Sequence, residues 1–131
     1  MRKDITIPEV KEVYIAAVQE FNADFNTYDW NAYIINNSSQ PLETVLIVSH
    51  GLGEHTKTTQ MRHALKVLPS KNYAKIEFLE EQVFSIINYF SVTYFTGNTL
   101  FDKRFEFPAN SIVQDNTVEL PVMGKKGVLA R

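Results

Sequence analysis

The sequence predicts an all-β fold, an antiparallel β-sandwich of about seven or eight short strands. Short segments rich in aromatic and β-branched residues recur about every ten residues, clusters of turn-forming residues separate them, and strands do not alternate with helices. The chain has 131 residues, 44% of them hydrophobic, including nine Phe, six Tyr and one Trp. Because this size and composition suit one domain with its own core, residues 1–131 are expected to form a single β-sandwich domain.

The first apolar segment, residues 8–21 (PEVKEVYIAAVQEF), satisfies two periodicities. Its apolar residues recur at i, i+3, i+4 and i+7, and Pro8 suits the first turn of a helix. The same residues also alternate, with Val13, Ile15 and Ala17 on one side. The helical count is locally the better one, but a sandwich needs a first strand to cover its sheet. We therefore favour a strand and keep the helix as the alternative.

The next two segments are predicted strands on either side of a turn. Residues 28–35 (YDWNAYII) are rich in aromatic and β-branched residues and end at the turn cluster 36–41 (NNSSQP). Residues 42–49 (LETVLIVS) are apolar on both faces in their second half. That pattern predicts a central strand covered on both sides.

Two alternating segments follow, joined by the turn sequence PSKN. Residues 60–68 (QMRHALKVL) and 73–79 (YAKIEFL) each switch between apolar and polar residues, and in the second Ile76 and Phe78 lie opposite Lys75 and Glu77. Residues 80–82 (EEQ) break the alternation and are expected to form a single helical turn.

The clearest unit is a β-hairpin formed by residues 90–95 and 100–107 and closed on Gly97-Asn98, both of which tolerate a positive φ. One face of its second arm consists of phenylalanines interrupted by a lysine, which marks an edge strand: Phe101, Lys103, Phe105 and Phe107. The tail, residues 118–131, holds one short strand candidate and a basic end.

Short strands in this number and spacing are typical of immunoglobulin-like sandwiches. The likeness is architectural, because no paired cysteines flank Trp30. The chain has no cysteine at all, which excludes disulfides, thiolate zinc sites and cysteine nucleophiles.

Charge and hydropathy exclude further classes of partner. Thirteen Lys and Arg against fifteen Asp and Glu give a net charge of −2, which disfavours binding to DNA and to nucleic acids in general. No apolar run approaches the length of a membrane span, so no membrane partner is expected. The first ten residues, MRKDITIPEV, have no apolar stretch behind their early cations. No signal peptide is therefore expected, and the cytoplasm is the expected location.

Residues 50–55 (HGLGEH) resemble a segment of lysophospholipases and monoacylglycerol lipases of the α/β-hydrolase fold. That resemblance implies a Gly-x-Ser-x-Gly elbow followed by an acid and a histidine. No serine here lies between two such glycines, and no histidine follows His63 to act as the base. We therefore reject the hydrolase interpretation and expect a strand end followed by a glycine turn.

The same stretch contains the candidate metal ligands His50, Glu54, His55 and His63, all within fourteen residues. Their spacing matches no usual zinc signature and loop histidines are ordinarily solvated, so no metal or other cofactor is expected. Lys57 and Arg62, beside Gly51 and Gly53, are candidate contacts to an anion, but Glu54 opposes one.

A third candidate site combines aromatic and basic residues of the hairpin, as RNA-binding sheets do: Phe90, Tyr94, Phe95, Lys103 and Arg104. Aromatic residues in the strands of a small sandwich more often belong to its core. RNA binding is therefore disfavoured, although it remains an alternative.

The order of segments resembles a family of small bacterial proteins without established function. The resemblance covers nearly the whole chain and is carried by DWNAYIINN, PLETVLIVSHG, MRHALKVLP, YAKIEFL, VFSIINYFSVTYF and LFDKRFEF. Some members carry the name of the phenylalanine-tRNA synthetase alpha subunit. A class II synthetase core needs long motifs with an arginine that reaches the ATP phosphates, whereas Arg62 and Arg104 are the only mid-chain arginines here. Synthetase activity is therefore not supported, and the resemblance implies no catalytic residues.

The sequence thus predicts a non-enzymatic protein-interaction or scaffolding module. Its expected contact surfaces are the loop 50–60 and the edge strand ending near Phe107, with a homodimer through an edge strand as one arrangement. The candidate partner-binding residues are Lys57, Arg62, Lys103 and Arg104. The alternatives are a small-ligand or metal-binding protein that uses the histidines of residues 50–63, and an RNA- or tRNA-associated accessory protein.

Overall fold

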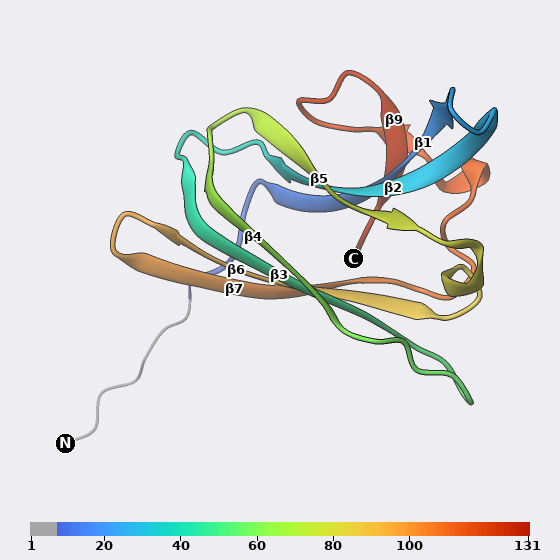
Figure 1. Ribbon diagram of the computed structural model, residues 1–131. Coiled ribbons are helices and arrows are strands. Elements are labelled where there is room, and N and C mark those ends of the chain that lie inside the picture. The colour runs from blue at the N-terminus through green and yellow to red at the C-terminus, as the bar shows by residue number, and fades with distance from the viewer. Residues whose placement is uncertain (1–7) are drawn as a thin grey trace.

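The computed structural model describes residues 8–131, which form nine strands in two antiparallel sheets without an α-helix (Figure 1). The strands are β1 (Val13–Asn22), β2 (Thr27–Asn36), β3 (Leu42–Leu52), β4 (Met61–Leu68), β5 (Asn72–Leu79), β6 (Ile87–Thr96), β7 (Thr99–Phe107), β8 (Val118–Glu119) and β9 (Lys126–Leu129). Two 3-10 turns, η1 (Glu81–Val83) and η2 (Gln114–Asn116), complete the elements. Within residues 8–131 no helix is long and apolar enough to cross a membrane.

The two sheets form the expected sandwich-like pair of layers. One sheet has the order β5-β2-β1-β9-β8 and the other has the order β4-β3-β6-β7 (Figure 1). The predicted number of strands was too low, because the tail contributes two strands where one was expected. β8 and β9 share only the residue pairs Val118↔Gly127 and Glu119↔Lys126, which is too short a ladder for an alternating pattern to show. The prediction about a signal peptide rests mainly on residues 1–7, which lie outside the described residues.

β1 confirms the strand interpretation of the ambiguous first segment. It pairs with β2 along its whole length, from Val13↔Asn36 to Asn22↔Thr27. Both of its faces are buried: Ile15 and Ala17 face the sandwich core, while Ala16 and Val18 pack beneath the C-terminal segment that follows β8. Such a nearly continuous apolar run satisfies helical spacing as well as alternation, which explains the ambiguity.

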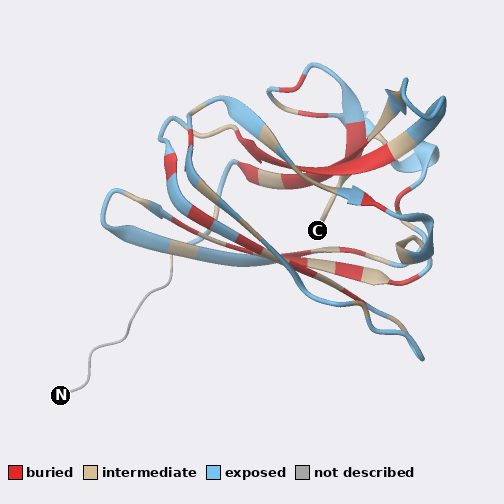
Figure 2. Cartoon of the chain, viewed as in Figure 1, coloured by how far each residue is buried: buried red, intermediate tan, exposed pale blue. Residues whose placement is uncertain are grey.

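β3 corrects one prediction. It is central, between β4 and β6, as expected, and Val45 and Ile47 are buried. Its outer face is not covered, since Leu46 is 39% exposed. Buried and exposed stretches alternate along this strand in Figure 2. Thr44, with a φ of 50°, lies at an irregularity in the pairing with β6, and it resets the alternation so that Val45 points inward.

The predicted β6–β7 hairpin is confirmed. The strands pair from Asn88↔Phe107 to Thr96↔Thr99, and the turn residue Gly97 has a φ of 61°. β7 lies at a sheet edge, as its lysine predicted, and Lys103 Nζ lies 4.6 Å from the centroid of the Phe105 ring. The expected helical turn after β5 is also present, as η1.

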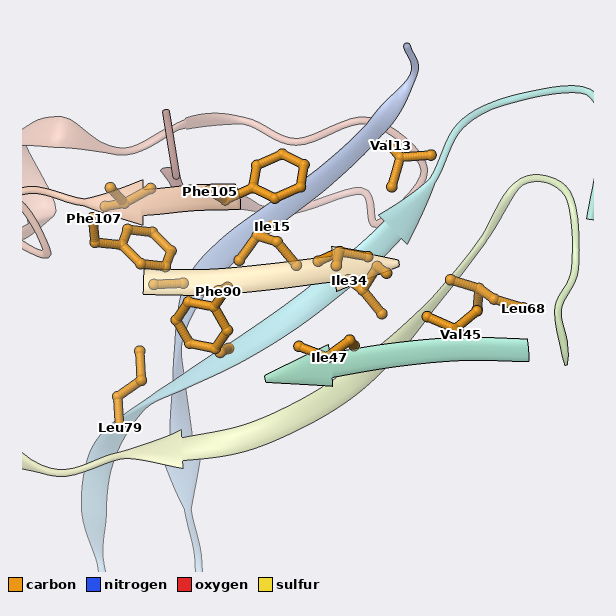
Figure 3. Close-up of a cluster of buried hydrophobic side chains, with 14 of the residues drawn as sticks. Val13, Ile15, Ile34, Val45, Ile47, Leu68, Leu79, Phe90, Phe105 and Phe107 are labelled. Atoms are coloured by element: carbon orange, nitrogen blue, oxygen red, sulfur yellow. The ribbon is translucent and has the colours of Figure 1, made fainter. Parts of the chain in front are cut away.

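The core lies between the two sheets and is built around phenylalanines (Figure 3). Phe90, Phe105 and Phe107 are each 2% exposed or less, and the Phe90 and Phe107 rings meet edge to face at 5.8 Å. Ile15 and Ile34 from the opposite sheet pack against the same cluster. Edge-to-face packing of large rings favours this one arrangement of the two layers.

A buried asparagine holds two of the four connections at which the described part of the chain changes sheets. Asn36, fully buried, directs its Nδ2 at the carbonyl oxygens of Gln40 (2.9 Å), Leu68 (3.1 Å) and Pro69 (3.1 Å). Its Oδ1 accepts hydrogen bonds from the backbone N–H (3.0 Å) and hydroxyl (2.6 Å) of Ser38. The β2–β3 and β4–β5 connections are therefore fastened to the same side chain.

Truncating the core should be far more damaging than truncating an exposed ring. We expect Phe107→Ala to lower the free energy of unfolding by about 3–5 kcal/mol, because it leaves a cavity between the sheets. Phe95→Ala is the control, since Phe95 is 38% exposed, and its loss should be about 1 kcal/mol. Urea denaturation followed by circular dichroism measures both, and equal losses would contradict this packing.

Candidate functional site

A cavity of about 270 Å³ opens at one end of the sandwich. Residues of β3, β5, β6 and η1 line it, and the loop that follows β3 contributes Thr58 and Thr59. This is the end at which the long β3–β4 hairpin projects beyond the other strands (Figure 1). The stretch HGLGEH therefore belongs to a rim of the fold, as a strand end followed by a glycine loop.

Glu77 reaches this cavity because β5 contains a β-bulge. Ala32 pairs with Glu77 but the next residue of β2, Tyr33, pairs with Lys75, so Ile76 is the extra residue. Simple alternation had placed Glu77 with Lys75 and opposite Phe78 and Ile76. That prediction was wrong for Glu77 and Phe78, because the bulge leaves the Glu77 side chain only 12% exposed and Phe78 50% exposed.

The Glu77 carboxylate connects the two sheets. Ser49 Oγ of β3 donates to Glu77 Oε1 at 2.7 Å, and His63 Nε2 of β4 lies 2.8 Å from the same oxygen. In a nucleophilic triad the imidazole stands between serine and acid, whereas here the carboxylate stands between serine and imidazole. The cluster is therefore suited to holding a carboxylate in place and not to activating the hydroxyl.

The four candidate metal ligands are not brought together. His63 is occupied by Glu77, and the His50 ring packs against Tyr89 with 5.2 Å between centroids. Glu54 and His55 lie exposed in the loop after β3. Across residues 8–131 no three histidine, aspartate or glutamate side chains form a group that could hold a metal ion.

The four candidate partner-binding cations do not form one patch either. Paired residues form one row across the second sheet: Arg62 of β4, Val48 of β3, Ser91 of β6 and Arg104 of β7. Arg62 and Arg104 therefore lie at opposite edges of this sheet. Lys103 precedes Arg104 in the strand and so points to the other face. Lys57 lies in the β3–β4 loop, where its backbone forms an isolated antiparallel β-bridge with Leu52.

Two of the three aromatic residues in the disfavoured RNA-stacking candidate belong to the core, as the sequence analysis expected of such residues. Phe90 and Tyr94 are 1% and 3% exposed, so their rings cannot receive bases. Burial also raises the pKa of Tyr94 to about 12. Both residues point inward because alternate residues of β6 face the core.

A second surface, missed from the sequence, lies at the tip of the β1–β2 hairpin. Four aromatic side chains are exposed by 50% or more at this tip and on the neighbouring strand β5: Phe21, Phe25, Tyr28 and Phe78. We call these four residues the aromatic rim. Phe25 is 77% and Tyr28 70% exposed, and the Phe21 and Tyr28 rings meet edge to face at 5.2 Å. Three aromatic residues within the eight residues FNADFNTY were the available signal. The sequence interpretation placed Phe21 in one segment, Tyr28 in the next and Phe25 in neither.

Polar side chains line the open groove, of about 820 Å³, beside the aromatic rim. Glu20 Oε1 accepts hydrogen bonds from the Tyr33 hydroxyl at 2.6 Å and Asn31 Nδ2 at 2.9 Å, and Lys125 Nζ lies 3.3 Å from Oε2. Burial acts to raise the pKa of Glu20, but these donors outweigh it and lower the pKa below its ordinary value. Burial and the bond to Glu20 raise the pKa of Tyr33.

Comparisons of this chain with protein-family models, with curated proteins and with solved structures give no match.

Removing the carboxylate between the sheets should destabilise the fold. Glu77→Ala leaves the Ser49 hydroxyl and the His63 imidazole without their acceptor, and we expect a loss of about 1–3 kcal/mol in the free energy of unfolding. Glu77→Gln keeps an acceptor oxygen and should lose less. Urea denaturation at neutral pH tests this, and an alanine variant as stable as the wild type would contradict it.

Glu20 should make stability depend on pH in one direction. Because folding lowers its pKa, the ionised form stabilises the folded state above the ordinary value of 4.5, and this stabilisation is lost as pH falls through the folded-state pKa. Below pH 4.5 the wild type should therefore lose stability more steeply than Glu20→Gln. Tyr33→Phe should raise the Glu20 pKa in a carbon-13 NMR titration of the carboxylate. An unmoved titration curve would disprove the role of the Tyr33 hydroxyl.

Proposed function

We propose that this protein is a non-enzymatic interaction module that binds another protein through the aromatic rim. The observation that carries the proposal is the exposure of Phe25 and Tyr28, 77% and 70%, at the tip of one hairpin. Soluble domains rarely expose clustered large aromatic side chains without a binding role. Such side chains are enriched in protein interfaces, where they bury a large area and often dominate the binding energy.

The hairpin that presents the rim is held in shape before any partner arrives. Asn22 Nδ2 donates to Asp29 Oδ2 at 2.9 Å, and Thr27 Oγ1 donates to Asp29 Oδ1 at 3.0 Å. The backbone N–H of Asp24 is bonded to Asn22 Oδ1 at 3.0 Å. A surface that is already ordered loses less conformational entropy on binding, which favours its use as a docking site.

Charge around the groove favours a different protein over a second copy. Glu20 and Asp29 line the groove and Asp24 lies exposed at the turn. Lys75 is the one basic residue among the described residues that line the groove, and Lys125 beside it pairs with Glu20 alone. A symmetric dimer through this surface would set these carboxylates against their own copies. The partner that fits presents aliphatic side chains to the aromatic rim and lysine or arginine to the acids.

The immunoglobulin-like assignment is part of this proposal. β2 pairs with β1 and β5, and β6 pairs with β3 and β7, as strands B and F do with their neighbours in immunoglobulin sandwiches. β4 pairs with β3, as an added strand does in the variable type. Such sandwiches commonly present loops and hairpin tips to partners. The resemblance to the small bacterial family and the absence of cysteine support a cytoplasmic partner.

Peptide selection tests the proposal. A random peptide display library, selected on the immobilised protein, is expected to yield sequences that combine aliphatic with basic residues. Their affinity should fall at least about tenfold for the double variant Phe25→Ser/Tyr28→Ser, because exposed aromatic anchors carry most of such binding energy. Phe95→Ser, which alters an exposed ring on the other sheet, is the matched control and should leave the affinity unchanged.

Two results would overturn the proposal. One is a set of selected peptides whose binding the double variant leaves intact. The other is a dimer of this chain at micromolar concentration, seen by sedimentation and abolished by the same double variant, which would make the aromatic rim a self-association surface.

A further inference from the structure

The cavity at the end of the sandwich has the composition of a small-ligand site, and no residue of the β1–β2 hairpin lines it. Its floor is apolar, formed by Leu79 and Phe90, which are 3% and 1% exposed, with Val83 of η1 beside them. A few polar groups, Glu77 among them, converge over this floor, as they do in most ligand pockets. Its volume of about 270 Å³ is close to the lower end of the range for drug-sized ligands, so the ligand is a small one.

The hydrogen-bond donors around the cavity are largely committed to the protein. Four of the lining side chains donate to acceptors of the chain: Ser49 to Glu77, Thr58 to Thr59, Gln82 to Glu80, and Asn88 to Val83 and Ile86. Acceptors remain available. Both hydrogen bonds to Glu77 fall on Oε1, which leaves Oε2 for a donor from a ligand.

The lining contains acidic side chains and, apart from histidine, no basic ones. Two carboxylates, Glu77 and Glu80, line the cavity with His50, and none of the lysines and arginines among residues 8–131 does. His63 lies 2.8 Å from Glu77 Oε1 and leaves Oε2 free of this contact. The Glu77 side chain is 12% exposed, so it acts in a medium of lower dielectric constant than water, where attraction to a cation is strengthened. An anion would meet these carboxylates with few free donors to bind it.

Gly51 of HGLGEH lines this cavity, and Gly53 packs near it against Ile86. A Cβ atom on Gly51 would lie 2.7 Å from Ile86 Cδ1 and 3.2 Å from Asn88 Oδ1, and one on Gly53 would lie 2.7 Å from Ile86 Cγ2. Both distances to Ile86 are too short for real contacts. Because neither position carries a Cβ atom, the strand end packs this closely against Ile86, and a larger residue there would require the Ile86 side chain to shift.

We propose that this cavity binds a small organic cation, a primary ammonium compound with a short apolar chain. The ammonium group donates to Glu77, and the chain lies against Phe90 and Leu79. This site adjoins the proposed protein interface and differs from it in its main residues. Phe78 borders both the cavity and the groove, but Phe25 and Tyr28 do not line the cavity.

The test uses n-butylammonium chloride as the probe and sodium butyrate, of similar size and opposite charge, as its counterpart. Amide nitrogen-15 NMR spectra of the full chain at neutral pH follow each titration. We expect saturable shifts with butylammonium at Ser49, Glu77 and Asn88, and no saturable shifts with butyrate. Glu77→Gln should weaken the binding at least about tenfold, since it removes a charged hydrogen-bond acceptor but keeps its shape.

Three further variants make the result specific. Glu119→Gln removes an exposed carboxylate from β8 and should leave butylammonium binding unchanged. Val83→Phe narrows the cavity while Glu77 stays in place, and it should also abolish binding, so the test stands if Glu77→Gln fails to fold. The double variant Phe25→Ser/Tyr28→Ser should bind butylammonium normally, which separates this proposal from the protein-interaction proposal. Equal binding of butyrate, or butylammonium binding that survives both cavity variants, would overturn it.

Discussion

The hydrogen bonds of Asn36 are the constraint on which the arrangement of the two sheets depends. One buried side chain, satisfied on both its oxygen and its nitrogen, fastens the β2–β3 and β4–β5 connections to each other. Those connections carry the chain from one sheet to the other and back. With the layers fixed in this way, the phenylalanine core can close between them, and Ser49 and His63 of one sheet can meet Glu77 of the other. A buried amide is costly unless every polar atom is paired, so this position tolerates few other side chains.

Elements with a strong local period were predictable from the sequence, and features set by pairing between distant strands were not. The β6–β7 hairpin, its Gly97 turn and the edge position marked by Lys103 all follow from neighbouring residues. The bulge at Ile76 does not, because it exists only in the register of β5 against β2. The cover over β1 is also non-local, since it comes from a segment more than a hundred residues later in the chain.

The candidate site was predictable only in part, for the same reason. His63 was a candidate because it is a histidine close in sequence to His50 and His55. Its partner Glu77 had been assigned to the outward face of β5. The neighbourhood of His50 holds an aromatic ring and not a second ligand. The aromatic rim was hidden because a polar turn divides Phe21 from Tyr28, and only the hairpin pairing brings their rings together. Chemistry that depends on two segments cannot be seen in either segment alone.

The short strand β9 has a consequence for co-translational folding. β9 pairs with β1 at Ala16↔Leu129 and Ala17↔Val128, and the backbone of Arg131 exchanges two hydrogen bonds with Glu106 of β7. The last described residues thus close one sheet and join the edge of the other. While residues 118–131 are still in the ribosome exit tunnel, β1 lacks β9 as its neighbour, and its apolar outer face lacks the cover that Leu120 and Met123 provide. Folding on the ribosome therefore stays incomplete until residues 126–131 emerge, and chaperones that recognise exposed apolar strands have that interval in which to bind.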